Sequence, residues 1–325
     1  MANMITRTDA QALIDEQISN EIIQEVTKKS FVLSAAKRLQ NMTSDKTKLR
    51  VLDSLPVAGF VEGDTGLKPT SKVDWSNVYL TAEEIAVIIP IAENVLNDAS
   101  YDIWGQIKPL VVEAFGKVID NAILNGTNAP QSWGTGIIAK ITSAGNVVPF
   151  NAQETLYTQI DKAMVLVEED GFIPTAIVGG VGLKSGFRNM LDTSGQPIKG
   201  TEIDSINRYF VDNGAWNTAG AKLITGDFSN LVYAIRQDVT YKVLDQAVIS
   251  DSDGKVLYNL AQQDMVALRV VLRMGYAVPN PVTSLNPDEG TRYPFALVKA
   301  TADSVPETPG NGGSESEGEG EGTGA

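Results

Sequence analysis

Residues 100–126 read SYDIWGQIKPLVVEAFGKVIDNAILNG, and this stretch decides the fold. Its apolar residues recur every three or four positions, the spacing that predicts one long helix with an apolar face. Ser100 is a favoured residue for the start of a helix, Asn125-Gly126 supplies the glycine at which helices commonly end, and Pro109 is expected to bend the helix. The expected apolar face comprises Ile103, Trp104, Ile107, Leu110, Val111, Phe115, Val118, Ile119, Ala122 and Ile123.

Strands are predicted on both sides of this helix. Before it, residues 85–91 form an apolar run typical of a buried strand. Near the other end of the chain, residues 266–277 alternate apolar residues with polar or small ones, which places Arg269 and Arg273 on one face of a strand. The mixture of short strands and helices in between indicates an α+β fold. Helices are predicted at 155–169 and from a turn at 179–180 to about 191, and strands at 49–55, 175–178, around 209, 222–225, 231–236, 240–249 and 255–261.

Two segments ahead of the long helix have too few apolar residues to build a core of their own. Residues 56–81 mix glycines and prolines with aromatic and β-branched residues. This composition predicts a long hairpin that needs a surface to rest on, or else an ordinary surface loop. Residues 9–29 carry an apolar stripe with helical spacing, which predicts an amphipathic helix that must lie on something. A second, short helix is expected at 31–39.

The chain has 325 residues and contains neither histidine nor cysteine. Its length predicts roughly two domains. The missing residue types exclude hydrolases with a histidine base, histidine-ligated metal centres, zinc fingers and disulfides. Carboxylate chemistry stays open, including a hydrolase that uses two acids distant in sequence. No cofactor and no metal is expected.

The formal net charge of −14 is unevenly distributed. Between Lys28 and Arg50 there are seven basic residues and one acid, whereas six acids and no base follow Lys299. Because phosphate binding needs a concentrated basic footprint, the chain is not expected to coat duplex DNA. The basic segment either meets an acidic partner or is simply a solvated helix face. Its candidate contact residues are Lys37, Arg38, Lys46, Lys48 and Arg50.

Three motifs resemble functional ones without matching them. The glycine-rich stretch 179–186 departs from the spacing of a phosphate-binding loop and from the dinucleotide fingerprint, so a plain turn is expected. Residues 251–254 resemble part of a calcium loop, but Ile249 and Leu260 occupy ligand positions, so a hairpin turn is expected. The neighbouring acids at 83–84 and 168–169 point in different directions on a strand or helix.

The carboxyl-terminal residues 303–325 are rich in glycine and acid and are predicted to be disordered. The longest apolar run, residues 86–92, is too short to span a membrane, and the amino terminus lacks a signal-peptide pattern. A soluble, unsecreted protein with no membrane partner is expected.

The order of the segments, more than any single motif, resembles a known family. The segments concerned are 58–63, 68–72, 78–82, 88–91, 94–100, 120–126, 134–137, 224–228 and 264–276. Over roughly residues 10–300 the chain resembles the major capsid protein family of tailed bacteriophages, the Hong Kong 97-type family with the Johnson fold. That fold combines an N-terminal arm, an extended loop, a spine helix with a long antiparallel sheet (the peripheral domain) and a mixed α/β axial domain.

The resemblance implies a division of the chain into regions. They are the N-terminal arm 1–55, the extended loop 56–82, the spine helix and first part of the peripheral domain 83–135, the axial domain 136–231, the peripheral sheet 232–278, a return to the axial domain 279–302, and the acidic tail 303–325.

The resemblance also implies contacts between subunits. The expected contact residues are Gly59, Phe60, Glu62, Gly63, Lys68, Lys72, Trp75, Arg269 and Arg273. Some members of the family join subunits by an isopeptide bond between a loop lysine and an asparagine. Lys68 and Lys72 could supply the lysine, but residues 262–264 read Gln-Gln-Asp where the asparagine is expected, so no cross-link is expected. Many members begin with a cleaved scaffolding segment, whereas this sequence starts almost at once with the arm.

The function that the resemblance implies is structural. The chain is expected to assemble with itself, as hexamers and pentamers, into the icosahedral head of a tailed phage that encloses double-stranded DNA without sequence-specific binding. A portal and a scaffold or decoration protein are the other expected partners. The location is the virion, after assembly in the cytoplasm of a bacterial or archaeal host. Two alternatives stay open, an encapsulin-type compartment that loads cargo protein and a soluble carboxylate-using enzyme.

Overall fold

The computed structural model describes residues 30–58, 60, 70–98, 103–190, 196, 206–217 and 220–300. The predicted helix at 9–29, Ser100 and the tail at 303–325 lie outside the described residues.

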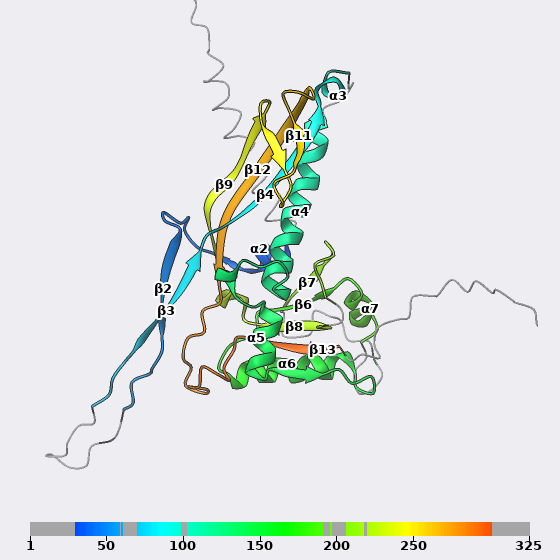
Figure 1. Cartoon of the computed structure of the whole chain (residues 1–325). Coiled ribbons are helices and arrows are strands. Elements are labelled where there is room, and N and C mark those ends of the chain that lie inside the picture. The colour runs from blue at the N-terminus through cyan, green and yellow to red at the C-terminus, as the bar shows by residue number, and fades with distance from the viewer. Residues whose placement is uncertain are drawn as a thin grey trace, which may run out of the picture.

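A four-stranded sheet and one long helix form the elongated half of the molecule (Figure 1). The strand order is β1 (Lys37–Arg38), β9 (Val232–Leu244), β12 (Met265–Ala277) and β4 (Glu83–Ala92). Helix α4 (Ile103–Asn125) lies along this sheet and runs through Pro109 without interruption. It ends where predicted, because Gly126 adopts a left-handed φ of 71° that favours glycine.

The predicted alternation in the last long strand is confirmed. Every second residue of β12 is buried in the core against α4, with Val270 fully inaccessible. These core residues of β12 are Leu268, Val270, Leu272, Met274 and Tyr276. The β12 strand pairs antiparallel with β4 through ten residue pairs, from Met265 with Ala92 to Met274 with Glu83. The sheet and α4 therefore form the large apolar core on one face of the sheet, whereas Val232, Ala234 and Ala277 belong to a second, smaller apolar cluster.

A five-stranded sheet forms the compact half. Its order is β5 (Val147–Pro149), β13 (Phe295–Lys299), β8 (Leu223–Gly226), β6 (Ala176–Gly180) and β7 (Asn207–Val211). Helices α5 (Ile137–Ala144), α6 (Leu156–Glu169) and α7 (Leu183–Arg188) surround this sheet (Figure 1). The predicted helix at 155–169 is confirmed, and Thr155 caps it by accepting a hydrogen bond from the Thr158 amide.

A hairpin projects away from both halves (Figure 1). It consists of β2 (Lys46–Leu52) paired antiparallel with β3 (Trp75–Thr81). Its root is held by a small apolar cluster in which Leu80 is fully buried beside Met42 and Val232. The smaller elements are α2 (Phe31–Ala35), α3 (Glu93–Asp98), β10 (Val248–Ser250), β11 (Val256–Asn259) and single turns of 3₁₀-helix at Gln131–Trp133 and Phe228–Asn230.

Several sequence predictions were wrong in detail. The helix expected at 31–39 ends at Ala35, and the following residues form β1. The strands expected at 231–236 and 240–249 are one continuous strand, β9, since Val239 is buried and continues the pattern across the polar residues between them.

Two further differences concern the sheets. The turn expected at Gly179-Gly180 belongs to strand β6, where a side chain on Gly180 would lie 2.8 Å from Trp216. The run expected as a fully buried strand is an edge strand, β4, and Ile88 is 42% exposed on its outer face. Within the described ranges, no helix combines the length and the apolar character needed to cross a membrane.

Candidate assembly surfaces

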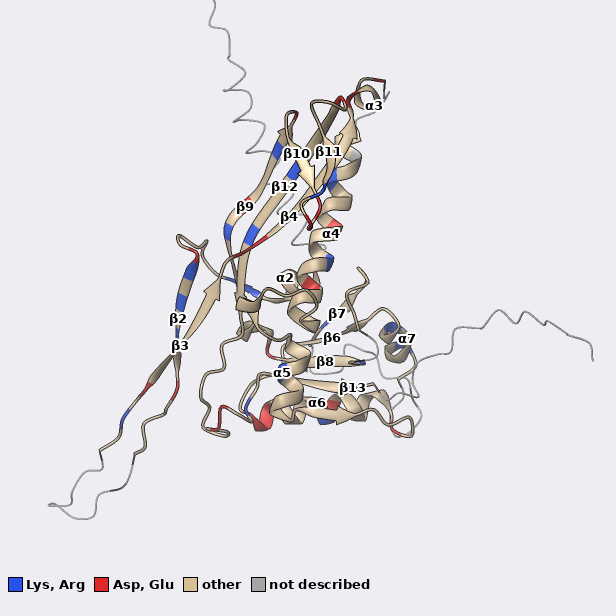
Figure 2. Ribbon diagram, viewed as in Figure 1, with Lys and Arg blue, Asp and Glu red and all other residues tan. Residues whose placement is uncertain are grey.

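The exposed face of the hairpin is basic and aromatic. Because side chains alternate along a strand, Lys46, Lys48 and Arg50 of β2 point to the same side. Lys48 stands opposite Tyr79 of β3 in the register, and Tyr79 is 56% exposed. The described residues include no acid in salt-bridge contact with these three cations. Figure 2 shows basic residues along β2 on this projecting element.

The outer part of the hairpin exposes apolar side chains. Phe60 is fully exposed, Trp75 is 63% exposed and Val57 is 74% exposed. Lys72 forms a surface ion pair with Asp74 at 2.7 Å, a kind of contact that contributes little to stability. The other loop residues expected as contacts, Gly59, Glu62, Gly63 and Lys68, lie outside the described residues.

The other two residues of the expected basic cluster lie apart from the hairpin. Lys37 and Arg38 form β1, which pairs in parallel with the start of β9. Both side chains are exposed, and Arg38 donates a hydrogen bond to Asn41 at 3.2 Å. The structure thus divides the basic segment between a sheet edge and the hairpin face.

The outer face of the long sheet carries the two arginines of β12, in different surroundings. Arg273 donates to the Asp45 carboxylate at 3.1 Å, so it has an acidic partner within its own subunit. Arg269 is exposed and stands opposite Lys242 of β9 in the register. Like charges in directly opposite positions repel each other, so this pair destabilises the isolated subunit slightly.

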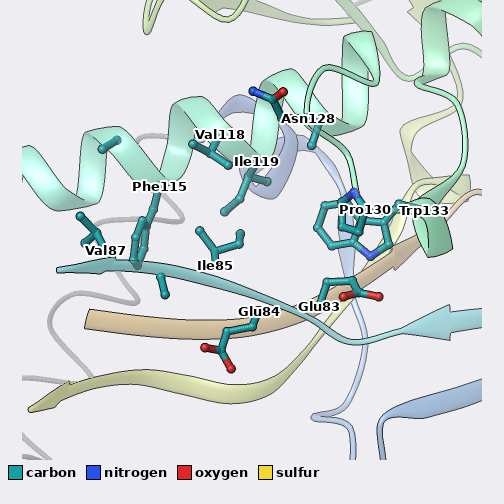
Figure 3. Close-up of a pocket in the computed structure, with 13 residues that line it drawn as sticks. Glu83, Glu84, Ile85, Val87, Phe115, Val118, Ile119, Asn128, Pro130 and Trp133 are labelled. Atoms are coloured by element: carbon teal, nitrogen blue, oxygen red, sulfur yellow. The ribbon is translucent and has the colours of Figure 1, made fainter. Parts of the chain in front are cut away.

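A groove of about 360 Å³ lies between α4 and β4 (Figure 3). Ile85 and Val87 point from β4 toward Phe115 and Val118 of α4, so the walls are largely apolar. Glu83 and Glu84 lie at the end of the groove where β4 begins.

The sequence analysis missed this groove because it assigned too many residues to the buried face of α4. Leu110 is 64% exposed and Val118 is 47% exposed, so both were wrongly placed in the core. The apolar residues of this helix are more numerous than one face can hold, and that excess was the available signal.

A buried carboxylate anchors the chain where the described residues begin. Asp120 of α4 accepts hydrogen bonds from the Ser30 hydroxyl at 2.7 Å and the Val32 amide at 3.1 Å. It also accepts from the Phe31 amide at 3.1 Å and the Asn213 side chain at 2.6 Å. Burial raises the pKa of the Asp120 carboxyl above its ordinary value of 3.8, although these four donors act to lower it. Asp120 thereby fixes the point at which the N-terminal region meets α4.

No metal-binding cluster accompanies these surfaces in the described part of the chain. Groups of three or more acidic side chains that could hold a metal ion are absent among those residues. The residues expected as a calcium-loop look-alike form the turn between β10 and β11, where Asp251 accepts from the amides of Asp253 and Lys255.

A helix-backed long sheet, a compact mixed sheet and a projecting hairpin together define the class of Johnson-fold shell proteins. The chain belongs to the phage capsid family, whose model matches residues 10–283. It is 28% identical over 278 residues to the major capsid protein of Staphylococcus phage 80alpha, with 84% of this chain and 83% of that protein covered.

Solved structures agree with this family. A chain from Microbacterium phage Oxtober96 is 35% identical with a TM-score of 0.75, and the match covers 84% of this chain and 91% of that chain. A chain from Mycobacterium phage Adephagia is 32% identical, also with a TM-score of 0.75, covering 84% and 90%. The protein is therefore a structural protein of a phage capsid shell, located in the virion.

Proposed function

We propose that the protein assembles as hexamers and pentamers into the icosahedral head of a tailed phage and encloses double-stranded DNA. The observation that carries this proposal is the hairpin. It projects from the rest of the subunit and exposes Val57, Phe60 and Trp75 to solvent. Exposed apolar side chains gathered on a projecting element are typical of a surface that contacts another protein. Membership in the phage capsid family favours another copy as that molecule.

The proposed roles of the regions follow the two halves of the fold. The long sheet with α4 serves as the peripheral domain, and the five-stranded sheet with α5 to α7 serves as the axial domain around the centre of a capsomer. The extended loop corresponds to the whole hairpin, whose paired strands begin at Lys46 rather than at residue 56. The arm is then the chain before Lys46, with Ser30 fixed on α4.

The enclosed DNA is held without sequence-specific binding. A net charge of −14 keeps the wall from adhering to packed DNA, since like charges repel. A portal protein and a scaffold or decoration protein complete the particle, which forms in the host cytoplasm. The role is structural and not enzymatic. No feature of the described surfaces favours the encapsulin-type alternative, which shares the fold.

The direct test is electron microscopy of the purified chain, with light scattering across concentration and salt. Capsomers or closed shells are expected, because a contact of about 4 kcal/mol is only millimolar alone but becomes durable when repeated in a closed lattice. A compact monomer under all conditions would contradict the proposal. Shells that load a cargo enzyme in cells instead of packaging DNA would favour the encapsulin-type alternative.

The two arginines of β12 are expected to respond differently to substitution. Arg269→Glu replaces the repulsive pair with Lys242 by an attractive one, so the isolated subunit should gain roughly 0.5 kcal/mol of unfolding free energy. We propose that Arg269 also meets an acidic group of a neighbouring copy, so shell yield should nevertheless fall because the new carboxylate repels that group. Arg273→Ala removes only a surface pair with Asp45 and should leave shell yield unchanged. Denaturant titration and particle counting measure the two effects, and equal shell yields for both variants would argue against Arg269 as a contact.

A further inference from the structure

Four strands of the five-stranded sheet, β5, β13, β6 and β7, run in the same direction and finish at the same end of the compact half. Helix α7 follows β6 at this end, and β8, which runs in the opposite direction, begins there. Basic residues belong to these elements or adjoin them, and Figure 2 shows those of α7. We refer to this set as the cationic end, and its members are Lys184, Arg188, Arg208, Lys222 and Lys299.

Aromatic rings hold three of these cations on the same side of the sheet. The Lys222 ammonium lies 3.2 Å from the centre of the Phe150 ring. The Lys184 ammonium lies 5.2 Å from the centre of the Phe210 ring, and the Arg208 guanidinium lies 5.4 Å from the phenylalanine ring of α7. All three rings pack in or against one apolar cluster between the sheet and helices α6 and α7. Cation–π contacts therefore gather these positive charges on one surface.

The cationic end has few acidic partners in the described part of the subunit. None of its members forms a salt bridge with a described residue. Burial lowers the pKa of the Lys222 ammonium below its ordinary value of 10.5. Among the described acids at this end of the sheet, Glu154 already pairs with Lys162 at 2.7 Å, and Asp212 follows β7. The cations therefore outnumber the acids, and their field attracts an anionic partner.

The acidic tail 303–325 follows closely on this surface in the sequence. The last described residue, Ala300, comes directly after Lys299 of the cationic end. The tail contains six acids and no base, and four of these acids stand at alternate positions from Glu315 to Glu321. In extended conformation residues 315–321 would cover about 20 Å, compared with about 15 Å for the three strand spacings from β13 to β7. The tail therefore complements the cationic end in charge and in length.

A covalent tether favours the tail over a free anion such as the phosphates of DNA. A flexible chain as long as residues 300–315 spans about 20 Å on average, which is the scale of the surface. Such a tether gives roughly millimolar effective concentration. Non-specific contacts between cations and a polyanion have dissociation constants of about 0.1 mM or lower at physiological salt. A tethered polyanion with that affinity occupies its site about ten times as often as it leaves it empty.

We propose that the acidic tail 303–325 binds the cationic end of its own subunit, with the glutamates of residues 315–321 lying across the cations of α7, β7 and β8. The glutamates pair with cations that have no salt bridge in the described part of the subunit, and the aromatic rings keep those cations in place. The contact lies within one subunit, so it does not depend on the proposed shell function.

A spin label on the tail tests the contact directly. Because the natural chain has no cysteine, Ser316→Cys gives one attachment site, between two glutamates. We expect a slow-motion component in the spectrum at about 0.1 M salt and its loss near 1 M, since the screening length falls from about 10 Å to about 3 Å. The combined variant Lys184→Gln, Arg188→Gln and Lys299→Gln should abolish the component at low salt. These three side chains are exposed, so the fold should be kept.

A matched variant removes the same amount of charge from the elongated half. It combines Lys117→Gln, Lys242→Gln and Lys255→Gln, all at exposed positions. The slow-motion component should persist in this variant, and both combined variants should unfold at similar denaturant concentrations. Equal loss of the component in both would mean that the tail responds to overall charge, which contradicts a specific site.

Lysine acetylation read by mass spectrometry locates the tail without a label. In a chain that lacks residues 303–325, Lys184 and Lys299 should become up to about tenfold more reactive, the factor by which the bound tail protects them. The reactivity of Lys117 and Lys255 should not change. The difference between the two chains should vanish near 1 M salt, roughly where screening releases the tail.

A cysteine pair distinguishes the tail's own subunit from a neighbouring one. Ser185→Cys lies at an exposed position of α7 and is combined with Ser316→Cys. The disulfide should form within one chain, which keeps the monomer mass on a denaturing gel. Disulfide-linked dimers alone would place the tail on a neighbouring copy and overturn the proposal.

The remaining outcomes also overturn the proposal. These are a freely mobile label at low salt, equal lysine reactivity in the natural and the shortened chain, and lysines that stay reactive in both chains until a short DNA duplex is added, which would identify phosphate as the ligand. None of the readouts requires an assembled shell, so their failure is distinguishable from failure of the proposed function.

Discussion

Replacing residues 54–73 by Asn-Gly is expected to abolish shell formation while leaving the subunit folded. The replacement joins Asp53 to Asp74 through a two-residue turn of the kind that tight hairpins prefer. The pairs from Lys46–Thr81 to Leu52–Trp75 and the apolar root around Leu80 are kept. What is lost is the outer hairpin, with the exposed side chains that we propose as contacts.

The size of the effect follows from repetition. Each contact between subunits contributes only about 4 kcal/mol, so the shell depends on many copies of it. Because every subunit of the variant loses the same contact, the loss is repeated throughout the lattice. Negative-stain microscopy and light scattering should show free subunits or capsomers only. Circular dichroism and the midpoint of denaturant unfolding should match those of the natural chain, because the paired strands and the apolar root of the hairpin are kept. Normal shells from this variant would remove the hairpin from the account of assembly.

Asp120→Ala is expected to cause the largest loss of stability in the subunit, about 3 kcal/mol or more. The substitution leaves the Ser30 hydroxyl, the Phe31 and Val32 amides and the Asn213 side chain without their acceptor in a buried site. Each buried polar group left unpaired costs roughly 1–3 kcal/mol. Urea unfolding of the hairpin-shortened chain, which should not assemble, measures the change.

Control substitutions separate this loss from a general effect of removing a charge. Asp161→Ala on the exposed face of α6 should change the unfolding free energy by less than about 0.5 kcal/mol. Asn213→Ala removes one of the four donors and should fall between the two. Equal stability of the Asp120 and Asp161 variants would show that the buried network contributes little.

The raised pKa of Asp120 gives this network a pH dependence with a definite sign. From its ordinary pKa of 3.8 up to the raised value, the folded chain binds this proton more tightly than the unfolded chain does. The contribution of Asp120 to the unfolding free energy is therefore fully present below pH 3.8 and is lost as pH rises through the raised pKa. The difference between the natural chain and Asp120→Asn should fall across that window, and a rise would contradict the direction of the shift.

Local periodicity predicted the elements that bury one face and expose the other. The alternation along β12 and the spacing along α6 were correct because one face of each packs on a core. The hairpin was recognised, but its start was missed. In residues 46–52, basic side chains alternate with Thr47, Leu49 and Val51, which is a strand pattern. The prediction placed this strand at 49–55, three residues too late.

The contacts that join distant segments could not be predicted in the same way. Nothing near Asp120 in the sequence indicates that its carboxylate accepts a hydrogen bond from Ser30, which lies ninety positions away. The groove could not be predicted without the orientation of α4 relative to β4, because only that orientation shows that Val118 faces solvent and Phe115 does not. The ion pair of Arg273 with Asp45, which comes from the turn before β2 in the same chain, likewise joins segments that are distant in the sequence.

The position of β13 determines how late in synthesis the subunit can finish folding. This strand is the last one in the described residues, yet it lies between β5 and β8 inside the five-stranded sheet. The compact half can close only after residue 299 has left the ribosome, and β4 must likewise wait for β12 to be synthesised before the two can pair. Such non-local pairings fold slowly. A nascent chain therefore lacks both finished sheets until its synthesis is nearly complete, which delays lattice growth until whole subunits are released.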